Sequence, residues 1–298
     1  MGTTVITGAT GYIGRHLVAR LVAEGQRPRC LIRDKARVNG LPTDRIEIVN
    51  GDITDAASLP TAMRGASSVV HMASVVAVVK ETKTLRYKQI NDAGTANVVK
   101  AAKDAGVRHF IHMGGLNTVP GTDGSYMRTR WNGEQHVKES GIPYTILQAS
   151  ILFGDSAAFF TALRDLAKTA PFVPVPGNGK LRFQPIWVED VVTCITKLLA
   201  EEGRNEIIPL GGPEFYTYDA ILDLIFKSIG KRRIKLHLPM PLIALGAGVM
   251  QTILPKPPLT TAALDLFASD NVTVLNAIPA RFGFQPRSLA TDMAEHGI

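Results

Sequence analysis

The first half of the chain alternates short apolar runs with longer segments in which apolar residues recur at helical spacing. Six runs rich in β-branched and aliphatic residues predict strands, at residues 3–7, 27–33, 46–52, 68–74, 109–115 and 142–150. Amphipathic segments predict helices, at residues 15–25, 90–105 and 125–141. Because strands and helices in this order are typical of βαβ units, we expect an α/β fold with a doubly wound parallel sheet.

Three glycines, Gly8, Gly11 and Gly14, lie between the first predicted strand and the first predicted helix. A tight turn there needs residues without a Cβ, and the free N–H groups of the helix N-terminus can bind a pyrophosphate. The spacing G-x-x-G-x-x-G is looser than the dinucleotide fingerprint G-x-G-x-x-G, but it stands in the strand–turn–helix context that the fingerprint requires. The motif therefore predicts a nucleotide-binding Rossmann fold.

The pattern becomes less regular after Gly154, where prolines interrupt it. Here the sequence predicts helices at residues 157–168 and 190–201. It also predicts a loop at 171–179 and a short extended run at 185–188. From residue 211 on, it predicts helices with proline interruptions. We expect residues 1–154 to form the dinucleotide-binding core and 155–298 a smaller, mostly helical C-terminal lobe for substrate or docking, with 183–211 returning to the core.

The end of the second predicted strand indicates which nucleotide is bound. NAD-binding domains usually place an acidic residue there, against the ribose 2′-hydroxyl. In this chain the strand ends at Arg33, Asp34 comes one place later, and Arg37 follows one helical turn on. Because a planar guanidinium suits a 2′-phosphate, we expect NADP(H) in preference to NAD(H). Asp52 and Ile53, after the third strand, are expected at the adenine, although Asp52 could instead cap the helix that follows.

The charge balance favours an anionic partner. Lysine and arginine number 33 against 26 acidic residues, a formal net charge of +7. No aromatic residues interleave the basic clusters, so nucleic acid is the least favoured partner. The two cysteines, Cys30 and Cys194, have neither disulfide nor metal spacing, and no other group has metal-ligand spacing. Buried thiols and the lack of a signal-peptide pattern predict a cytoplasmic protein without a metal.

Residues 236–255 contain no acidic residue, lysine or arginine. The uninterrupted part, 242–254, is shorter than the ~20 residues that a membrane-spanning helix needs. A helix buried in the protein core is the first interpretation. The alternative is a helix at a membrane surface or membrane complex, because the basic segment KRRIK precedes it.

Several segments together resemble a known superfamily, in the order TGATGYIG, GDITD, VVHMAS, INDAGTANVVKAAKDAGVRHFIHM, YTILQASILFG and QPIWVEDVV. They resemble the extended and atypical short-chain dehydrogenases/reductases. The tail, with LGGPEFYTYDAILDLI, is similar to the group related to the nucleotide-binding accessory subunit of respiratory complex I. The resemblance covers nearly the whole chain.

This resemblance implies a Tyr-x-x-x-Lys catalytic pair on a helix and a serine or threonine after the fifth strand. The chain has Tyr126 and, four residues later, Arg130, with Gly114 and Gly115 where the hydroxyl is expected. Arginine supplies charge but does not readily pass on a proton, because it stays protonated at working pH. Tyr126 is therefore either a proton donor with an unusual partner or a structural tyrosine beside the cofactor.

Three functions remain open. The first is an NADP(H)-binding reductase of a hydrophobic carbonyl or quinone-like compound, with a degenerate Tyr-x-x-x-Arg site. The second is a non-catalytic nucleotide-binding accessory or assembly subunit of a membrane assembly, and the third is a sugar-nucleotide epimerase or dehydratase. The residues expected at the cofactor are Gly8, Thr10, Gly11, Tyr12, Ile13, Gly14, Arg33, Arg37, Asp52, Ile53, Ala73, Ser74, Gly114, Tyr126, Arg130, Ala149 and Ser150.

Overall fold

The computed structural model describes residues 2–122, 125–255, 257 and 259–297. The chain divides into two compact units. The first contains Met1–Val75, Glu81–Gln148 and Val191–Ile208, and the second contains Val76–Lys80, Ala149–Asp190 and Pro209–Ile298. The division into a dinucleotide-binding core at 1–154 and a substrate or docking lobe at 155–298 stays a prediction.

The first unit is built on a seven-stranded sheet with the order β11-β6-β5-β4-β1-β2-β3. Neighbouring strands from β5 to β3 pair in parallel. The strands are β1 (Thr3–Thr7), β2 (Arg29–Ile32), β3 (Glu47–Asn50), β4 (Ala66–His71), β5 (His109–Gly115), β6 (Tyr144–Ala149) and β11 (Glu206–Leu210). The strand order reverses at β1, which leads first to β2 and β3 and then to β4 on its other side.

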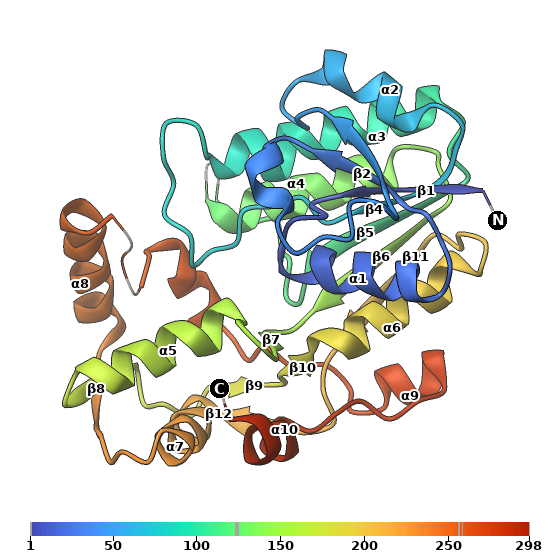
Figure 1. Ribbon diagram of the computed structural model, residues 1–298. Coiled ribbons are helices and arrows are strands. Elements are labelled where there is room, and N and C mark those ends of the chain that lie inside the picture. The colour runs from blue at the N-terminus through green and yellow to red at the C-terminus, as the bar shows by residue number, and fades with distance from the viewer. Residues whose placement is uncertain (1, 123–124, 256, 258, 298) are drawn as a thin grey trace. The chain divides into compact units, whose positions relative to one another are not determined.

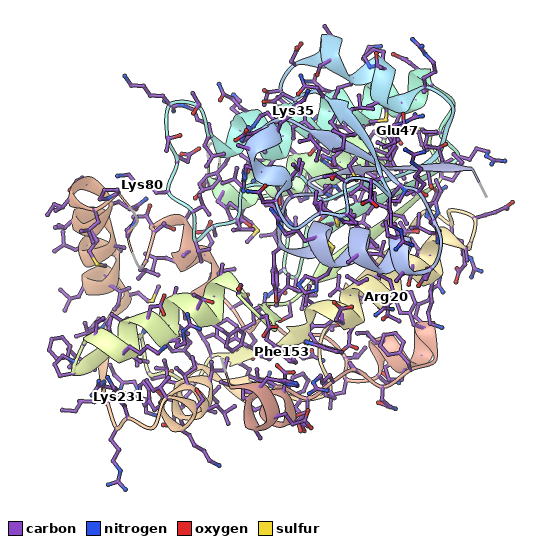
Figure 2. All side chains as sticks on the ribbon, viewed as in Figure 1. Arg20, Lys35, Glu47, Lys80, Phe153 and Lys231 are labelled. Atoms are coloured by element: carbon purple, nitrogen blue, oxygen red, sulfur yellow. The ribbon has the colours of Figure 1, made fainter. Side chains whose placement is uncertain are left out.

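Helices cover both faces of this sheet, as Figure 1 shows. Helices α2 (Leu59–Met63), α3 (Thr95–Asp104) and α4 (Tyr126–Lys138) lie on one face. Helix α1 (Tyr12–Ala23) and helix α6 (Val188–Leu199) lie on the other, where Arg20 of α1 donates to the hydroxyl of Thr193 at 3.5 Å (Figures 1 and 2). The predicted doubly wound α/β sheet is confirmed.

The core of the first unit follows from the composition of its central strands. Val5, Val69 and Phe110 are neighbours in register on β1, β4 and β5, and none of them has any exposed surface. Strands covered on both faces need apolar residues at successive positions, which is why these segments read as nearly continuous apolar runs. Short 3-10 turns, η1 (Lys35–Val38) and η2 (Ala56–Ser58), follow β2 and β3.

The helix expected at residues 90–105 is in fact two segments. A π-helix, η3 (Lys88–Gly94), precedes α3. Within η3, the Asn91 side chain accepts from the Val75 backbone N–H at 2.8 Å and donates to the Val75 carbonyl at 3.0 Å. The side chain thereby supplies both hydrogen-bond partners for the Val75 backbone in the loop after β4.

The second unit contains short two-stranded pairs and helices. Its strands are β7 (Leu152–Phe153), β8 (Phe172–Pro176), β9 (Arg182–Phe183), β10 (Ile186–Trp187), β12 (Tyr216–Thr217) and β13 (Ile234–Leu238). Its helices are α5 (Ala158–Thr169), α7 (Tyr218–Ser228), α8 (Met240–Ile253), η4 (Ala262–Phe267), α9 (Ala277–Phe282) and α10 (Leu289–His296). The expectation of a loop at 171–179 was wrong, because β8 pairs in parallel with β13. Prolines are tolerated on such edge strands.

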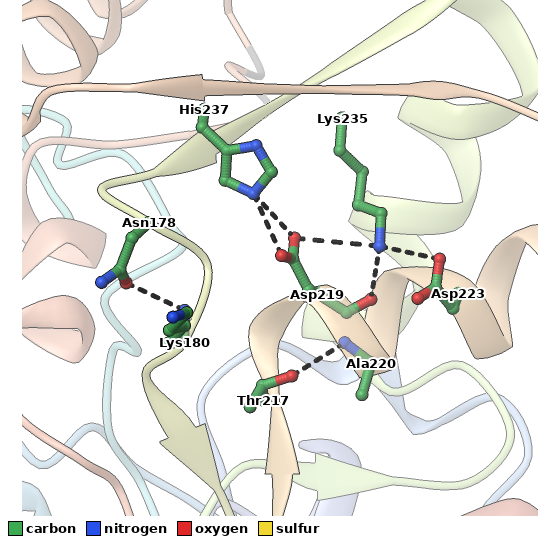
Figure 3. Close-up of polar contacts among 8 residues, drawn as sticks. All are labelled: Asn178, Lys180, Thr217, Asp219, Ala220, Asp223, Lys235 and His237. Atoms are coloured by element: carbon green, nitrogen blue, oxygen red, sulfur yellow. Dashed lines mark hydrogen bonds and ion pairs between the residues drawn. The ribbon is translucent and has the colours of Figure 1, made fainter.

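A polar cluster on α7 holds β13 in place, as Figure 3 shows. Asp219 pairs with His237 at 3.0 Å, and Lys235 pairs with Asp223 at 2.8 Å. The Lys235 ammonium also donates to the Asp219 backbone carbonyl at 3.2 Å. Because His237 and Lys235 both point toward α7, the alternate residues of β13 point away from it.

Helix α8 is not the buried core helix that we expected first. Among its residues only Ile243 and Ala247 are buried. Leu245 keeps 66% of its surface exposed and Ile253 keeps 70%. In the part of the chain that the structure describes, no helix combines the length and apolar character that crossing a membrane requires.

Candidate functional site

The turn between β1 and α1 is shaped by its glycines. Gly8 has a φ of +76°, which disfavours residues with a side chain, and a Cβ there would lie 2.7 Å from the Ala73 nitrogen. A Cβ on Gly14 would overlap the Gly8 carbonyl oxygen, whereas a Cβ on Gly11 would meet only that oxygen, at 3.1 Å. Gly8 and Gly14 are therefore needed for close backbone packing, and the space beside Gly11 is open.

This open space lies at the start of a helix. Gly11 is the N-cap of α1, and no side chain caps the helix there. Thr10, Tyr12 and Ile13 complete the turn, with the Tyr12 ring packed edge-on against His16 at 5.3 Å. A helix N-terminus without a side-chain cap, beside a backbone turn without Cβ atoms, fits the pyrophosphate of a dinucleotide.

A cluster of cations surrounds the end of β2. Arg33, Lys35 and Arg37 are exposed there, and Arg33 pairs with Asp52 at 3.6 Å. The guanidinium of Arg15, on α1, donates to the carbonyl of Thr10 at 3.1 Å, to that of Arg37 at 2.7 Å and to that of Asn39. Arg15, which the sequence analysis did not single out, thus ties the glycine turn to the basic turn η1.

Asp52 and Ile53 have local roles in the structure. The Asp52 carboxylate accepts from the Thr54 backbone N–H at 2.9 Å, while the cap of η2 is Asp55, which accepts from Ala57 at 3.1 Å. The alternative that Asp52 caps this segment was therefore wrong. Ile53 is 7% exposed, and its carbonyl accepts from Asn97 at 2.9 Å. Their contact with adenine stays a prediction.

A directed hydrogen-bond chain runs through His71 at the carboxyl end of β4. The Thr95 hydroxyl donates to the Asn91 carbonyl at 2.8 Å, so it accepts from His71 Nε2 at 3.0 Å. His71 Nδ1 is then an acceptor, and the Thr7 hydroxyl donates to it at 2.6 Å. Burial lowers the pKa of His71 to about 3, and the Arg130 cation adds to this effect. His71 is therefore a neutral imidazole with a fixed tautomer.

His112 lies beside His71, with the two rings stacked at 5.4 Å. Its Nδ1 atom is buried without a hydrogen-bond partner among the described residues. Burial lowers the pKa of His112 well below its ordinary value, with His71 and Arg130 contributing in the same direction. A small cavity of about 10 Å³ lies here, at the lower limit of the space that one ordered water needs. Ala73, Ser74 and Arg130 also line it.

Tyr126 and Arg130 are one turn apart at the start of α4. Ser125 caps this helix by accepting from the Arg128 N–H at 3.2 Å, which fixes Tyr126 as the first helical residue. The Tyr126 ring packs edge-on against Tyr87 at 5.2 Å. Arg130 donates to the Met113 carbonyl at 3.2 Å, near the end of β5. Positions i and i+4 share a helix face, so the structure brings both residues to the carboxyl edge of the sheet.

Glu134 fills the space beside Gly114. A Cβ on Gly114 would lie 2.6 Å from the Glu134 carboxylate, which is 2% exposed. Gln148 donates to both oxygens of that carboxylate, at 2.9 and 3.1 Å. Burial raises the pKa of the Glu134 carboxyl. A buried acid–amide pair therefore lies where the resemblance implies a hydroxyl, and no pattern in the sequence indicates this pair.

Ala149 is the last residue of β6 and Ser150 follows it, at the point where the second unit begins. The Ser150 hydroxyl is buried and donates to Asn271 Oδ1 at 2.7 Å. In this arrangement the hydroxyl serves the packing of the second unit. A contact of either residue with the cofactor stays a prediction. Among the described residues, no group of three or more His, Cys, Asp or Glu side chains is placed to hold a metal ion.

A comparison of the sequence with known protein families agrees with a nucleotide site at this position. The profile of a family described as NAD(P)H-binding matches residues 8–168, more than half of the chain. The chain belongs to this NAD(P)H-binding family. The match begins at Gly8 and includes the glycine turn, His71, Gly114 and α4.

The proteins to which this chain is similar include reductases and subunits of respiratory complex I. The chain is 29% identical over 247 residues to a ceramide reductase from Caulobacter vibrioides, covering 80% of this chain and 74% of the relative. It is 24% identical over 294 residues to the 40 kDa subunit of NADH-ubiquinone oxidoreductase from Neurospora crassa, covering 97% and 76%. Its fold is that of DesIV, a dTDP-glucose 4,6-dehydratase from Streptomyces venezuelae solved with NAD, at 20% identity and a TM-score of 0.71, covering 98% and 95%.

Proposed function

We propose that this NAD(P)H-binding protein prefers NADP(H) and slowly reduces a hydrophobic carbonyl or quinone-like compound through Tyr126. The observation that carries the proposal is the position of Arg130, one turn after Tyr126 and 3.2 Å from the Met113 carbonyl at the end of β5. A cation thus stands where the resemblance implies the catalytic lysine. The preference for NADP(H) is supported by exposed Arg33, Lys35 and Arg37 beside the glycine turn.

The proposed roles follow from the chemistry of each side chain. When bound, NADPH supplies a hydride. The glycine turn and the start of α1 hold the pyrophosphate, and Arg33 contacts the 2′-phosphate. The Tyr126 hydroxyl donates a proton to the substrate oxygen, and the Arg130 cation stabilises the tyrosinate that remains.

The same residues predict a slow reaction. Arg130 does not readily release a proton to restore the tyrosine hydroxyl. His71 and His112 are held neutral by burial, and His71 uses both ring nitrogens in its own hydrogen bonds. Glu134 takes the space beside Gly114 where a serine would orient the substrate oxygen. Because a positioned acid–base group contributes ~10²–10⁴-fold in rate, losing part of this set leaves slow turnover.

Turnover of a panel of hydrophobic aldehydes, ketones and quinones, followed at the NADPH absorbance band, tests the proposal. We expect slow oxidation of NADPH that Tyr126→Phe abolishes and Arg130→Lys raises several-fold. Tyr144→Phe, which removes a hydroxyl from β6, is the control and should leave the rate unchanged. Turnover that survives Tyr126→Phe would contradict the proposed role of Tyr126.

A second candidate is a non-catalytic accessory subunit. It is favoured by the complex I relative, whose match covers 97% of this chain. The two candidates differ in one measurement: an accessory subunit is stabilised against heat by NADPH but oxidises it with no compound in the panel, in any variant. The third candidate, a sugar-nucleotide epimerase or dehydratase, is supported by a likeness of fold, of which DesIV is one example.

A further inference from the structure

Helix α8 of the second unit presents an apolar stripe to solvent. Leu242, Leu245, Val249 and Ile253 are 54%, 66%, 49% and 70% exposed. Spacings of three, four and four residues place these side chains on one face of the helix. Ile243 and Ala247, on a different face, are buried. A helix that is apolar all round normally lies in a core or a membrane, so the exposed stripe lacks its apolar partner.

Exposed apolar residues continue onto the strand that leads into α8. Ile234 is 70% exposed and Leu236 is 43% exposed. Phe172, which stands opposite Ile234 in the β8–β13 register, is 52% exposed. Since Lys235 and His237 point toward Asp219 on α7, Ile234 and Leu236 lie on the other face of β13 (Figure 3). Lone exposed apolar side chains are common on proteins, but a group of this size marks an interaction surface.

Along the sequence, the segment that carries this surface is rich in cations, one of which, Lys235, is paired with Asp223 of α7 at 2.8 Å. No acidic residue occurs between Asp223 and Asp265, while six basic residues do: Lys227, Lys231, Arg232, Arg233, Lys235 and Lys256. At the end of α8, the Lys80 ammonium donates to the Leu254 carbonyl at 3.3 Å (Figure 2). Before β13, Lys231 and Arg233 donate to the last carbonyls of α5, at 3.0 Å and 2.7 Å, and still carry their charges.

We propose that the apolar stripe of α8 docks on an anionic lipid surface, with the neighbouring cations at the headgroups. The helix has 14 residues, too few to span a bilayer but enough to lie in its interface. Apolar side chains that enter the acyl boundary, in a chain segment that carries lysines and arginines but no acidic residue, are the pattern that anionic membranes select.

Sedimentation of the full-length protein with vesicles tests this docking. One vesicle population is phosphatidylcholine alone, and the other is phosphatidylcholine with about a third phosphatidylserine. We expect the protein to pellet with the anionic vesicles, to pellet less with the neutral ones, and to be released by high salt. The double variant Leu245→Gln/Val249→Gln should bind the anionic vesicles about tenfold or more weakly.

The matched control is Val274→Gln/Leu275→Gln, which removes two exposed apolar side chains of the second unit outside α8. It should bind vesicles like the wild type, and all variants should retain NADPH binding, which reports on folding. The proposal is overturned if the wild type does not pellet, or if the α8 variant pellets as well as the wild type. The proposal is also overturned if the wild type does not bind vesicles but self-associates, and the α8 variant abolishes this self-association. The stripe would then contact a second copy of the chain.

Discussion

At the scale of single residues, the organisation of the proposed 2′-phosphate site depends on Arg15. Its guanidinium donates to the carbonyls of Thr10, Arg37 and Asn39, so it joins the glycine turn to the turn after β2. Arg33 projects from that second turn and keeps 48% of its side chain exposed. Arg15 therefore orders the backbone, while the exposed side chain of Arg33, which pairs with Asp52 at 3.6 Å, is the one that we propose meets the 2′-phosphate.

Arg33→Ala is expected to weaken NADPH binding about tenfold or more while leaving NADH binding nearly unchanged. A charge-assisted contact to a phosphate contributes about 1.5–3 kcal/mol, and only NADPH carries that phosphate. Titration calorimetry with both nucleotides measures the effect. Arg27→Ala, which removes an exposed arginine just before β2, is the control and should alter neither affinity. Equal losses for both nucleotides would assign Arg33 a merely structural role.

At the scale of elements, the contact between β5 and α4 decides which residue can stand at position 114. Glu134 reaches from α4 to the backbone of β5, and Gln148 of β6 holds its carboxylate from the other side. Gly133 allows α4 an equally close approach to η3, because a Cβ there would lie 2.6 Å from the Asn91 carbonyl. At this edge of the sheet, glycines therefore leave the space that buried polar groups, the Glu134 carboxylate and the Asn91 carbonyl, occupy.

Gly114→Ser is expected to destabilise the protein by ~1–3 kcal/mol and not to restore catalysis, because the new side chain overlaps Glu134. Urea unfolding measures the loss. In the Glu134→Ala background, the same serine should lower the free energy of unfolding much less. The double-mutant cycle should therefore be strongly non-additive. Gly246→Ser is the control, since a Cβ there meets nothing within 4 Å. Additive effects of the two substitutions would refute the proposed overlap.

The elements of the first unit were the most predictable, because apolar periodicity and glycine stops report local structure. The β1–turn–α1 segment and α4 were placed within a few residues of their observed bounds. The π-helix was missed, since Asn91 inserts toward Val75 through contacts that no periodicity encodes. Strand β8 was taken for a loop because its prolines hid a pairing with a strand some 60 residues away.

The polar contacts of the candidate site were less predictable. Glu134 lies on a helix whose sequence is mostly polar, so nothing local shows that it is buried against Gly114. The partners of His71 come from β1 and α3, 64 and 24 residues away. For α8, composition correctly indicated an apolar helix, but it does not reveal whether the apolar partner lies within the same chain.

At the scale of the whole molecule, the two stacked imidazoles affect stability against acid. The folded pKa of His71, about 3, lies below the ordinary value of 6.5, and that of His112 is also depressed. Folding therefore favours the neutral rings. Their contribution to stability is fully present above pH 6.5 and is lost as the pH falls below it, because the unfolded chain binds the protons first.

The free energy of unfolding in urea should therefore decrease between pH 7 and pH 5. Each histidine contributes up to about 1.4 kcal/mol per pH unit to that slope below its unfolded pKa. His112→Leu removes one titrating ring and should flatten the slope. Phe110→Leu perturbs the same strand without removing a titrating group, and should lower stability at every pH while keeping the wild-type slope. An unchanged slope in His112→Leu would show that the ring is not buried in its neutral form.

The strand order also has a consequence during synthesis of the protein. Strand β6 ends at Ala149, but its neighbour β11 begins only at Glu206, after much of the second unit has been translated. At roughly 5–20 residues per second, the hydrogen-bonding edge of β6 is uncovered for several seconds on each ribosome. An uncovered edge of a largely apolar strand is a template for pairing with other chains. Over this interval the nascent protein therefore depends on infrequent encounters with other chains, or on chaperones. A fragment that stops at residue 154 would keep the strand edge exposed permanently and would aggregate.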